Sequence, residues 1–114
     1  MLYYDRQRYK MVTNEIRCIA KRLEQSVNPH KIYLFGSFAR NEERADSDYD
    51  FYLVMADSVT DRLLVSQTAY RSLRGMKRRS VDIVVGSVSG FEERKNRKPL
   101  ESVIDREGVV LYEK

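Results

Sequence analysis

The chain has 114 residues and a formal net charge of +4, with 42% hydrophobic and 33% charged residues, which favours one small globular domain over a disordered chain. No uncharged apolar run approaches the roughly 20 residues that a membrane-spanning helix needs, and no apolar stretch follows a basic start as in a signal peptide. The single cysteine, Cys18, excludes an internal disulfide framework and a cysteine-rich zinc site. We therefore expect a cytoplasmic protein that makes no contact with a membrane.

The positive charge is unevenly distributed along the sequence. Residues 1–57 are neutral overall, and the surplus lies in the second half, in two basic clusters at residues 71–79 and 94–98. Such clusters suit an anionic partner, but they are equally typical of a solvated helix face or loop. Charge alone leaves both interpretations open.

The first predicted element is an amphipathic helix over residues 5–27. An apolar stripe at helical spacing runs along it, formed by Val12, Ile16, Ile19, Leu23 and Val27. A second line of side chains either widens the buried face or contacts a partner or a second copy of the chain; it consists of Tyr4, Met11 and Cys18. The helix should end at Asn28, because the residue before a proline disfavours the helical conformation.

The remaining elements alternate between strands and helices. Strands are predicted at 31–35, 49–56, 81–85 and 109–112, and the second has apolar residues on both faces, as in a central strand. Helices are predicted within 38–47, from a capping box at Ser58 and Asp61 onward, and from Pro99 to Gly108, whereas 87–98 is given no element. This order favours an α+β fold with α/β-like layering, in which helices pack on a small mixed sheet of about four strands.

Gly36 and Ser37 form the first candidate site, directly after the strand at 31–35. Backbone N–H groups at the start of a helix, with a hydroxyl beside them, bind anions, and glycine lets a phosphate approach the main chain closely. A Gly-Ser pair after a strand is also a common turn, so alone it is weak evidence.

Three aspartates form the second candidate site. Asp48 and Asp50 alternate at the start of a strand, so their carboxylates should point to one face, unless the segment is only a solvated turn. Asp82 interrupts an apolar strand, where a buried charge is costly unless it is paired or bound to a metal. If the two strands are neighbours, a divalent cation would relieve the repulsion among the three carboxylates. Oxygen ligands favour Mg²⁺ or Mn²⁺, and the only histidine, His30, is interpreted as a loop residue.

A phosphate-binding turn beside three acids suits phosphoryl or nucleotidyl transfer. In that chemistry Asp48 and Asp50 would hold metal ions that offset phosphate charge, and Asp82 would help to deprotonate the attacking hydroxyl.

The segment from Gly36 to Asp50 resembles the signature of the polymerase-β-type nucleotidyltransferase superfamily, in which Gly-Ser is followed, after ten intervening residues, by Asp-x-Asp. Together with residues 81–84 and 106–112 it is similar to the minimal nucleotidyltransferases, the MNT family. Asn41 stands where that family usually has glycine, and asparagine also tolerates a left-handed backbone.

The resemblance implies a role for each matching residue. ATP would be the substrate, with its phosphates on the turn at Gly36 and Ser37 and with Arg40 close to a phosphate. The catalytic and metal-binding residues, for Mg²⁺ or Mn²⁺, would be Asp48, Asp50 and Asp82.

The MNT resemblance also implies a partner. Members are often encoded beside a HEPN-domain ribonuclease toxin and transfer AMP from ATP to a toxin tyrosine, which blocks the ribonuclease. We therefore expect an antitoxin that forms a homo- or hetero-oligomer, without direct nucleic-acid binding. We expect one domain over residues 1–114, with an N-terminal helix at 1–28 as a candidate partner contact and a catalytic core at 30–113.

Two other functions remain open at this point. An antitoxin that masks its partner by binding alone would depend on the charge distribution and the first helix more than on the acids. A small-molecule nucleotidyltransferase of the aminoglycoside-modifying kind, or a nucleic-acid polymerase, would need an additional region for the acceptor, for which this short chain has little room.

Overall fold

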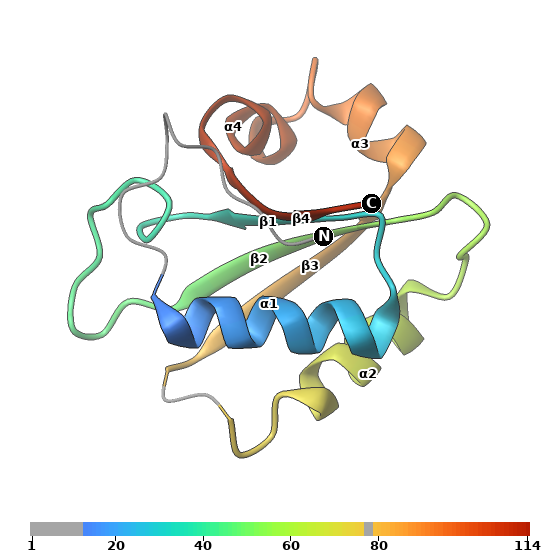
Figure 1. Cartoon of the computed structure of the whole chain (residues 1–114). Helices are drawn as coiled ribbons and strands as arrows, with labels where there is room; N and C mark the ends of the chain where they lie inside the picture. Colours follow the sequence, from blue (N-terminus) through green and yellow to red (C-terminus); the bar gives the residue numbers. More distant parts are fainter. Residues whose placement is uncertain (1–12, 77–78) are drawn as a thin grey trace.

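The computed structural model describes residues 13–76 and 79–114, in which helices cover both faces of a four-stranded sheet (Figure 1). Helices α1 (Asn14–Val27) and α2 (Arg62–Ser72) lie on one face, and α3 (Val88–Arg94) and α4 (Pro99–Glu107) lie on the other. The strands are β1 (Lys31–Phe35), β2 (Tyr49–Met55), β3 (Val81–Ser87) and β4 (Val109–Glu113). The predicted α+β fold is confirmed.

The sheet is mixed, in the order β3-β2-β1-β4. Strand β1 pairs antiparallel with β2 and β4, whereas β2 and β3 run parallel because α2 carries the chain back between them. Strand β2 therefore lies inside the sheet with helices on both faces, as its apolar residues predicted. None of the described helices is long and apolar enough to cross a membrane.

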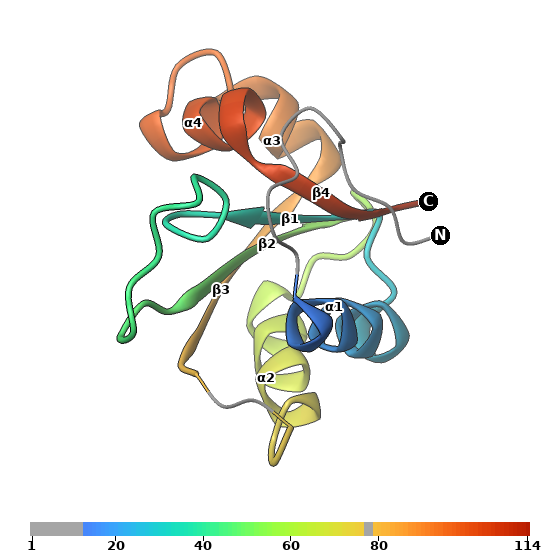
Figure 2. The ribbon, with the colours of Figure 1, turned by 60° about the vertical axis from the view of Figure 1, so that its left-hand side comes forward.

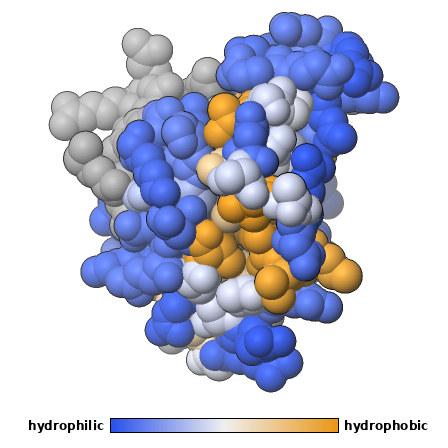
Figure 3. Space-filling model, turned by 90° about the vertical axis from the view of Figure 1, so that its right-hand side faces the viewer, coloured by the Kyte–Doolittle hydropathy of each residue, from blue (hydrophilic) through white to orange (hydrophobic). Residues whose placement is uncertain are grey.

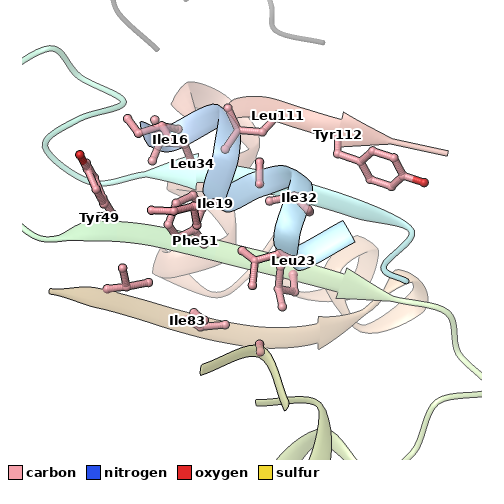
Figure 4. Close-up of a cluster of buried hydrophobic side chains, with 14 of the residues drawn as sticks. Ile16, Ile19, Leu23, Ile32, Leu34, Tyr49, Phe51, Ile83, Leu111 and Tyr112 are labelled. Carbon is pink, nitrogen blue, oxygen red and sulfur yellow. The ribbon is translucent and has the colours of Figure 1, made fainter. Parts of the chain in front are cut away.

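The core on the α1 side is built from the predicted apolar stripe. Ile16, Ile19 and Leu23 are fully buried and point at the sheet, where Figure 4 shows them beside Leu34 of β1 and Phe51 of β2. Full burial of one such side chain stabilises a fold by about 1.5–3 kcal/mol, so this stripe holds α1 on the sheet.

Of the second line in the first helix, Cys18 is exposed and does not join this core, whereas Tyr4 and Met11 lie outside the described residues. Residues 5–12 also lie outside them, and the described helix begins at Asn14, where the Thr13 side chain accepts a hydrogen bond from the backbone N–H of Ile16.

Two helix predictions need correction. Residues 38–47 form turns rather than a helix, because Asn41 takes a left-handed backbone (φ 59°) directly after a single turn. Helix α2 begins at Arg62 rather than at Ser58, because the capping side chain is that of Asp61, which accepts from the N–H of Leu64.

Helix α3 occupies a segment to which the sequence assigned no element. Ser87 caps it by accepting from the N–H of Gly90, and Phe91 is buried against Tyr33, with ring centroids 5.3 Å apart. Gly90 is a poor helix former, so capping and tertiary packing rather than propensity hold this short helix.

A buried polar pair links the sheet to α4. The Tyr52 hydroxyl donates to the Glu101 carboxylate at 2.8 Å, and Arg94 lies 3.9 Å from the same carboxylate. Burial and the Glu101 carboxylate raise the pKa of Tyr52 far above its usual value, so the hydroxyl keeps its proton. Gly86 borders this pair, and a Cβ there would collide with the Tyr52 hydroxyl.

We expect Tyr52→Phe to lower the free energy of unfolding by about 1–3 kcal/mol, because the buried Glu101 carboxylate loses its hydroxyl donor. Tyr112→Phe is the matched control: its ring is also buried, but within the described residues its hydroxyl makes no hydrogen bond. Chemical denaturation measures both variants. An equal loss in the two would contradict the role of the hydrogen bond.

Candidate active site

The parallel pairing of β2 and β3 brings two of the predicted acids side by side. Asp50 and Asp82 are both second residues of their strands and are direct partners in the register. Their strand neighbours Tyr49 and Val81 are buried in the core under α1 and α2, so the two aspartates point to the opposite face of the sheet. Asp48 directly precedes β2 and is exposed.

Asp82 itself is exposed, because β3 is an edge strand. The sequence predicted that Asp82 is buried and therefore needs a charged partner or a metal; this prediction is wrong, because the side chain is exposed. Asp50, on the inner strand, is the half-buried member of the group.

Gly36 lies against the Asp50 carboxylate. It follows β1, whose last residue, Phe35, pairs with Asp50 across the sheet. A Cβ on Gly36 would overlap the Oδ2 atom of Asp50, and the backbone there is left-handed (φ 75°). Only glycine satisfies both conditions without displacing the carboxylate.

The sequence predicted that an anion-binding helix begins after Gly36 and Ser37, but the chain forms only a single turn there. The N–H of Arg40 donates to the Gly36 carbonyl at 3.2 Å, and the N–H of Glu42 donates to that of Ser37 at 2.9 Å. Among the described residues, the N–H groups of Ser37, Phe38 and Ala39 have no such acceptor. Three free backbone donors beside a glycine form a turn that suits a phosphate group.

The electrostatics of the site centre on Asp50. Burial raises the pKa of its carboxyl first, the negative charges of Asp82 and Asp48 raise it further, and Arg40 opposes them, which leaves it at about 6. Asp48 and Asp82 therefore both lie close enough to Asp50 for their charges to act on its carboxyl.

These acids fit a cation that is shared with a substrate rather than enclosed by the protein. Their oxygens are the donors that Mg²⁺ and Mn²⁺ prefer, and neighbouring carboxylates favour a counter-cation. Across residues 13–76 and 79–114, however, no three acidic, histidine or cysteine side chains meet closely enough to form a metal site by themselves. Mg²⁺ in proteins commonly takes one or two carboxylates and completes its shell with water and substrate phosphates.

Arg40 lies at the rim of the site and is paired. Its Nε donates to Glu42 at 2.7 Å, and Nη1 lies 3.6 Å from Glu107, the last residue of α4. The carboxylates raise the pKa of Arg40, chiefly through the hydrogen bond to Glu42. The positive charge of Arg40 lowers the pKa of Asp50. A phosphate that binds Arg40 would have to compete with the carboxylates of Glu42 and Glu107.

Sequence reasoning missed Arg79, which it placed only within a basic cluster. Its Nη1 donates to three carbonyls of the loop before β2, those of Arg44 (3.2 Å), Ala45 (2.7 Å) and Ser47 (3.2 Å). Figure 2 shows this loop bending around the end of the sheet at which β2 and β3 begin. Arg79 thus fixes the chain immediately before Asp48.

The same guanidinium stacks on aromatic rings. It lies 5.1 Å from the ring centroid of Phe38 and 5.9 Å from that of Tyr49, and the two rings contact each other at 4.7 Å. Arg79 therefore joins the turn after Gly36 to the start of β2, the two segments that border Asp50.

The raised pKa of Asp50 predicts a pH-dependent stability in metal-free buffer. Because the folded state holds this proton more tightly than the unfolded chain does, the stabilisation is complete below about pH 4 and is lost as the pH rises through about 6. We expect the melting temperatures of wild type and Asp50→Asn to diverge across this interval, with the variant more stable at pH 8. If the difference in melting temperature between the two proteins stays constant from pH 4 to 8, the raised pKa of Asp50 is contradicted.

Comparisons with known proteins identify the family and the fold. A family model described as "Polymerase beta, Nucleotidyltransferase" matches residues 17–114. A crystal structure of a toxin–antitoxin with AMP-PNP superposes with a TM-score of 0.55 at 23% sequence identity, over 90% of this chain and 75% of that one, which shows a shared fold. No curated protein sequence matches significantly. The match over most of the chain, on a sheet that aligns Asp50 with Asp82, shows that this protein belongs to the polymerase-β nucleotidyltransferase family.

Proposed function

We propose that the protein transfers AMP from ATP to a tyrosine hydroxyl of a HEPN-type ribonuclease toxin and thereby acts as its cytoplasmic antitoxin. The observation that carries the transfer is the contact of Gly36 with Asp50, beside Asp82, in a member of a nucleotidyltransferase family. The toxin partner is supported by the resemblance to the MNT family and by the likeness to a toxin–antitoxin structure that was determined with AMP-PNP.

Each part of the site has a role in this proposal. Bound Mg²⁺ or Mn²⁺ would offset the charge of the triphosphate, held by Asp50 with Asp48 or Asp82. The free N–H groups after Gly36 would bind a phosphate and orient ATP. The tyrosine oxygen would bond to the α-phosphorus as the bond to pyrophosphate breaks, and Asp82 would accept the hydroxyl proton. Asp82 is exposed at the edge of the sheet, a position that suits an acceptor tyrosine carried by another protein.

The experiment is label transfer from ATP labelled at the α-phosphate to the product of the neighbouring gene, in the presence of Mg²⁺. We expect wild type to label that protein and Asp50→Asn to leave it unlabelled. Asp46→Asn is the matched control, because it removes an exposed acid from the loop before β2 and leaves Asp48, Asp50 and Asp82 unchanged. Absence of label with wild type, or full labelling with Asp50→Asn, would overturn the proposal.

Masking by binding alone is the second candidate, favoured by the exposed leucines of α2, Leu63 and Leu64. A growth assay separates the two functions. If the double variant Asp48→Ala/Asp50→Ala still neutralises the toxin, masking is sufficient. If the variant forms the complex without neutralising the toxin, masking is excluded and the chemistry is required.

A further inference from the structure

The outward face of α2 carries an unusual set of exposed apolar side chains. Leu63 and Leu64 are 68% and 56% exposed, and Tyr70, two turns further along, is 38% exposed. Val65 and Ala69, on the inward face, make the contact with the sheet, so the leucines are not needed to hold the helix. Figure 3 shows apolar surface gathered on the lower half of the molecule, the half that holds α1 and α2 in Figure 1.

A basic hollow lies on the same helix and shares Tyr70 with this apolar set. The hollow has a volume of about 370 Å³, and its lining residues all come from α2 and the turn after it: Ser66, Gln67, Tyr70, Arg71 and Arg74. Helical spacing places Leu63 on one line with Gln67 and Tyr70, and Arg74 lies in the turn after the helix. Among the described residues, no carboxylate pairs with either arginine.

Tyr70 connects this surface to the candidate active site. Its hydroxyl accepts a hydrogen bond from the N–H of Ile83 at 2.9 Å, on the outer edge of β3. Ile83 directly follows Asp82, which is exposed at the same edge. The Asp82 carboxylate points to the face of the sheet away from α2, so a segment bound along α2 would reach this acid by passing around the exposed edge of β3.

A larger basic hollow of about 510 Å³, lined by residues 94 and 97–101 between α3 and α4, fits an acidic partner less well. There Arg97 is paired with Glu93, and Arg94 lies 3.9 Å from the buried Glu101. Two of its three cations, Arg94 and Arg97, thus interact with carboxylates of the protein, whereas both cations of the α2 hollow, Arg71 and Arg74, are available to an external anion.

We propose that the outward face of α2 is where the acceptor protein docks, through a segment in which acidic and apolar side chains flank the hydroxyl that is modified. Arg71 and Arg74 would pair with the acids, Leu63 and Leu64 would bury the apolar residues, and the hydroxyl would reach Asp82 around the edge of β3. A polypeptide fits better than RNA, because nucleic-acid interfaces are more polar and more charged than a surface that contains two exposed leucines. The inference rests on the proposed transfer of AMP.

The test compares acceptors of opposite charge with ATP labelled at the α-phosphate. The probes are a random copolymer of glutamate and tyrosine, a copolymer of lysine and tyrosine, total RNA and the product of the neighbouring gene. We expect wild type to label the acidic copolymer at least tenfold faster than the basic one. Arg71→Glu/Arg74→Glu should slow labelling of the acidic copolymer and of the natural partner at least tenfold. Leu63→Ser/Leu64→Ser should slow labelling of the natural partner.

The matched control is Arg97→Glu/Lys98→Glu, which reverses the same charge in the hollow between α3 and α4 and should change these rates less than twofold. Binding of ATP with Mg²⁺, measured by calorimetry, should be unchanged in all three double variants. Equal effects of the two charge reversals, or label in RNA instead of polypeptide, would overturn the docking surface. If the natural partner is labelled equally by wild type and Arg71→Glu/Arg74→Glu, only the docking inference fails. If wild type binds ATP but labels no acceptor, the proposed function fails with it.

Discussion

Gly36→Ala is expected to slow nucleotidyl transfer about a hundredfold, the usual consequence of displacing a reacting group by about 1 Å. The added methyl group would overlap the Asp50 Oδ2 atom, so either the carboxylate or the turn after β1 must move. The left-handed backbone at Gly36 adds a strain of about 1–2 kcal/mol for alanine, which should lower the free energy of unfolding. Label transfer and chemical denaturation measure the two effects.

Gly75→Ala separates the two contributions. Gly75 has nearly the same φ (77° against 75°), but among the described residues no atom beyond its chain neighbours lies within 4 Å of the position that its Cβ would take. We expect a similar loss of stability from backbone strain and less than a twofold change in transfer. If both variants lose activity equally, global destabilisation explains the result and the contact between Gly36 and Asp50 has no special role.

The sequence predicted most elements whose apolar residues follow a clear period. The stripe of Ile16, Ile19 and Leu23 specified the face of α1, and Pro99 marked the start of α4. It failed where one local conformation or one tertiary contact decides the structure. A left-handed Asn41 ends the helix expected after Ser37, and burial of Phe91 holds a helix where Ser89 and Gly90 indicated none.

The candidate site was predictable to the extent that it depends on strand periodicity. Alternation predicted that Asp48 and Asp50 share a face, which stays a prediction because Asp48 precedes β2. The pairing of Asp50 with Asp82 was predicted on the assumption that their strands are neighbours, which the register confirms. The exposure of Asp82 was not predictable, because periodicity does not reveal which strand forms the edge of a sheet. The roles of these acids in metal binding and catalysis stay predictions for the transfer assay.

Contacts distant in sequence explain why Arg79 was missed. In the sequence it is one cation among several, and nothing there links it to carbonyls 32 to 35 residues earlier. In the structure, the N–H groups after Gly36 and the start of β2 come from different parts of the loop. Both need a common support if phosphate and acids are to keep a fixed geometry, and Arg79 is the residue that contacts both segments.

Arg79→Ala should therefore slow transfer about tenfold or more and lower the free energy of unfolding by about 1.5–3 kcal/mol, the range for hydrogen bonds to a charged group. We expect Arg79→Lys to recover little of either, because an ammonium group reproduces neither the planar donor fork nor the stacking on Phe38 and Tyr49. We expect the effect on transfer to appear in kcat, since the turn after Gly36 and the segment before Asp48 would both lose the contact that fixes their relative position.

Arg106→Ala is the matched control, because Arg106 is an exposed cation at the end of α4 and lies outside the loop before β2. It should leave transfer within twofold of wild type and the free energy of unfolding within about 0.5 kcal/mol. If Arg79→Lys were fully active, positive charge alone would be sufficient at this position. The three carbonyl contacts would then not be what fixes Asp48.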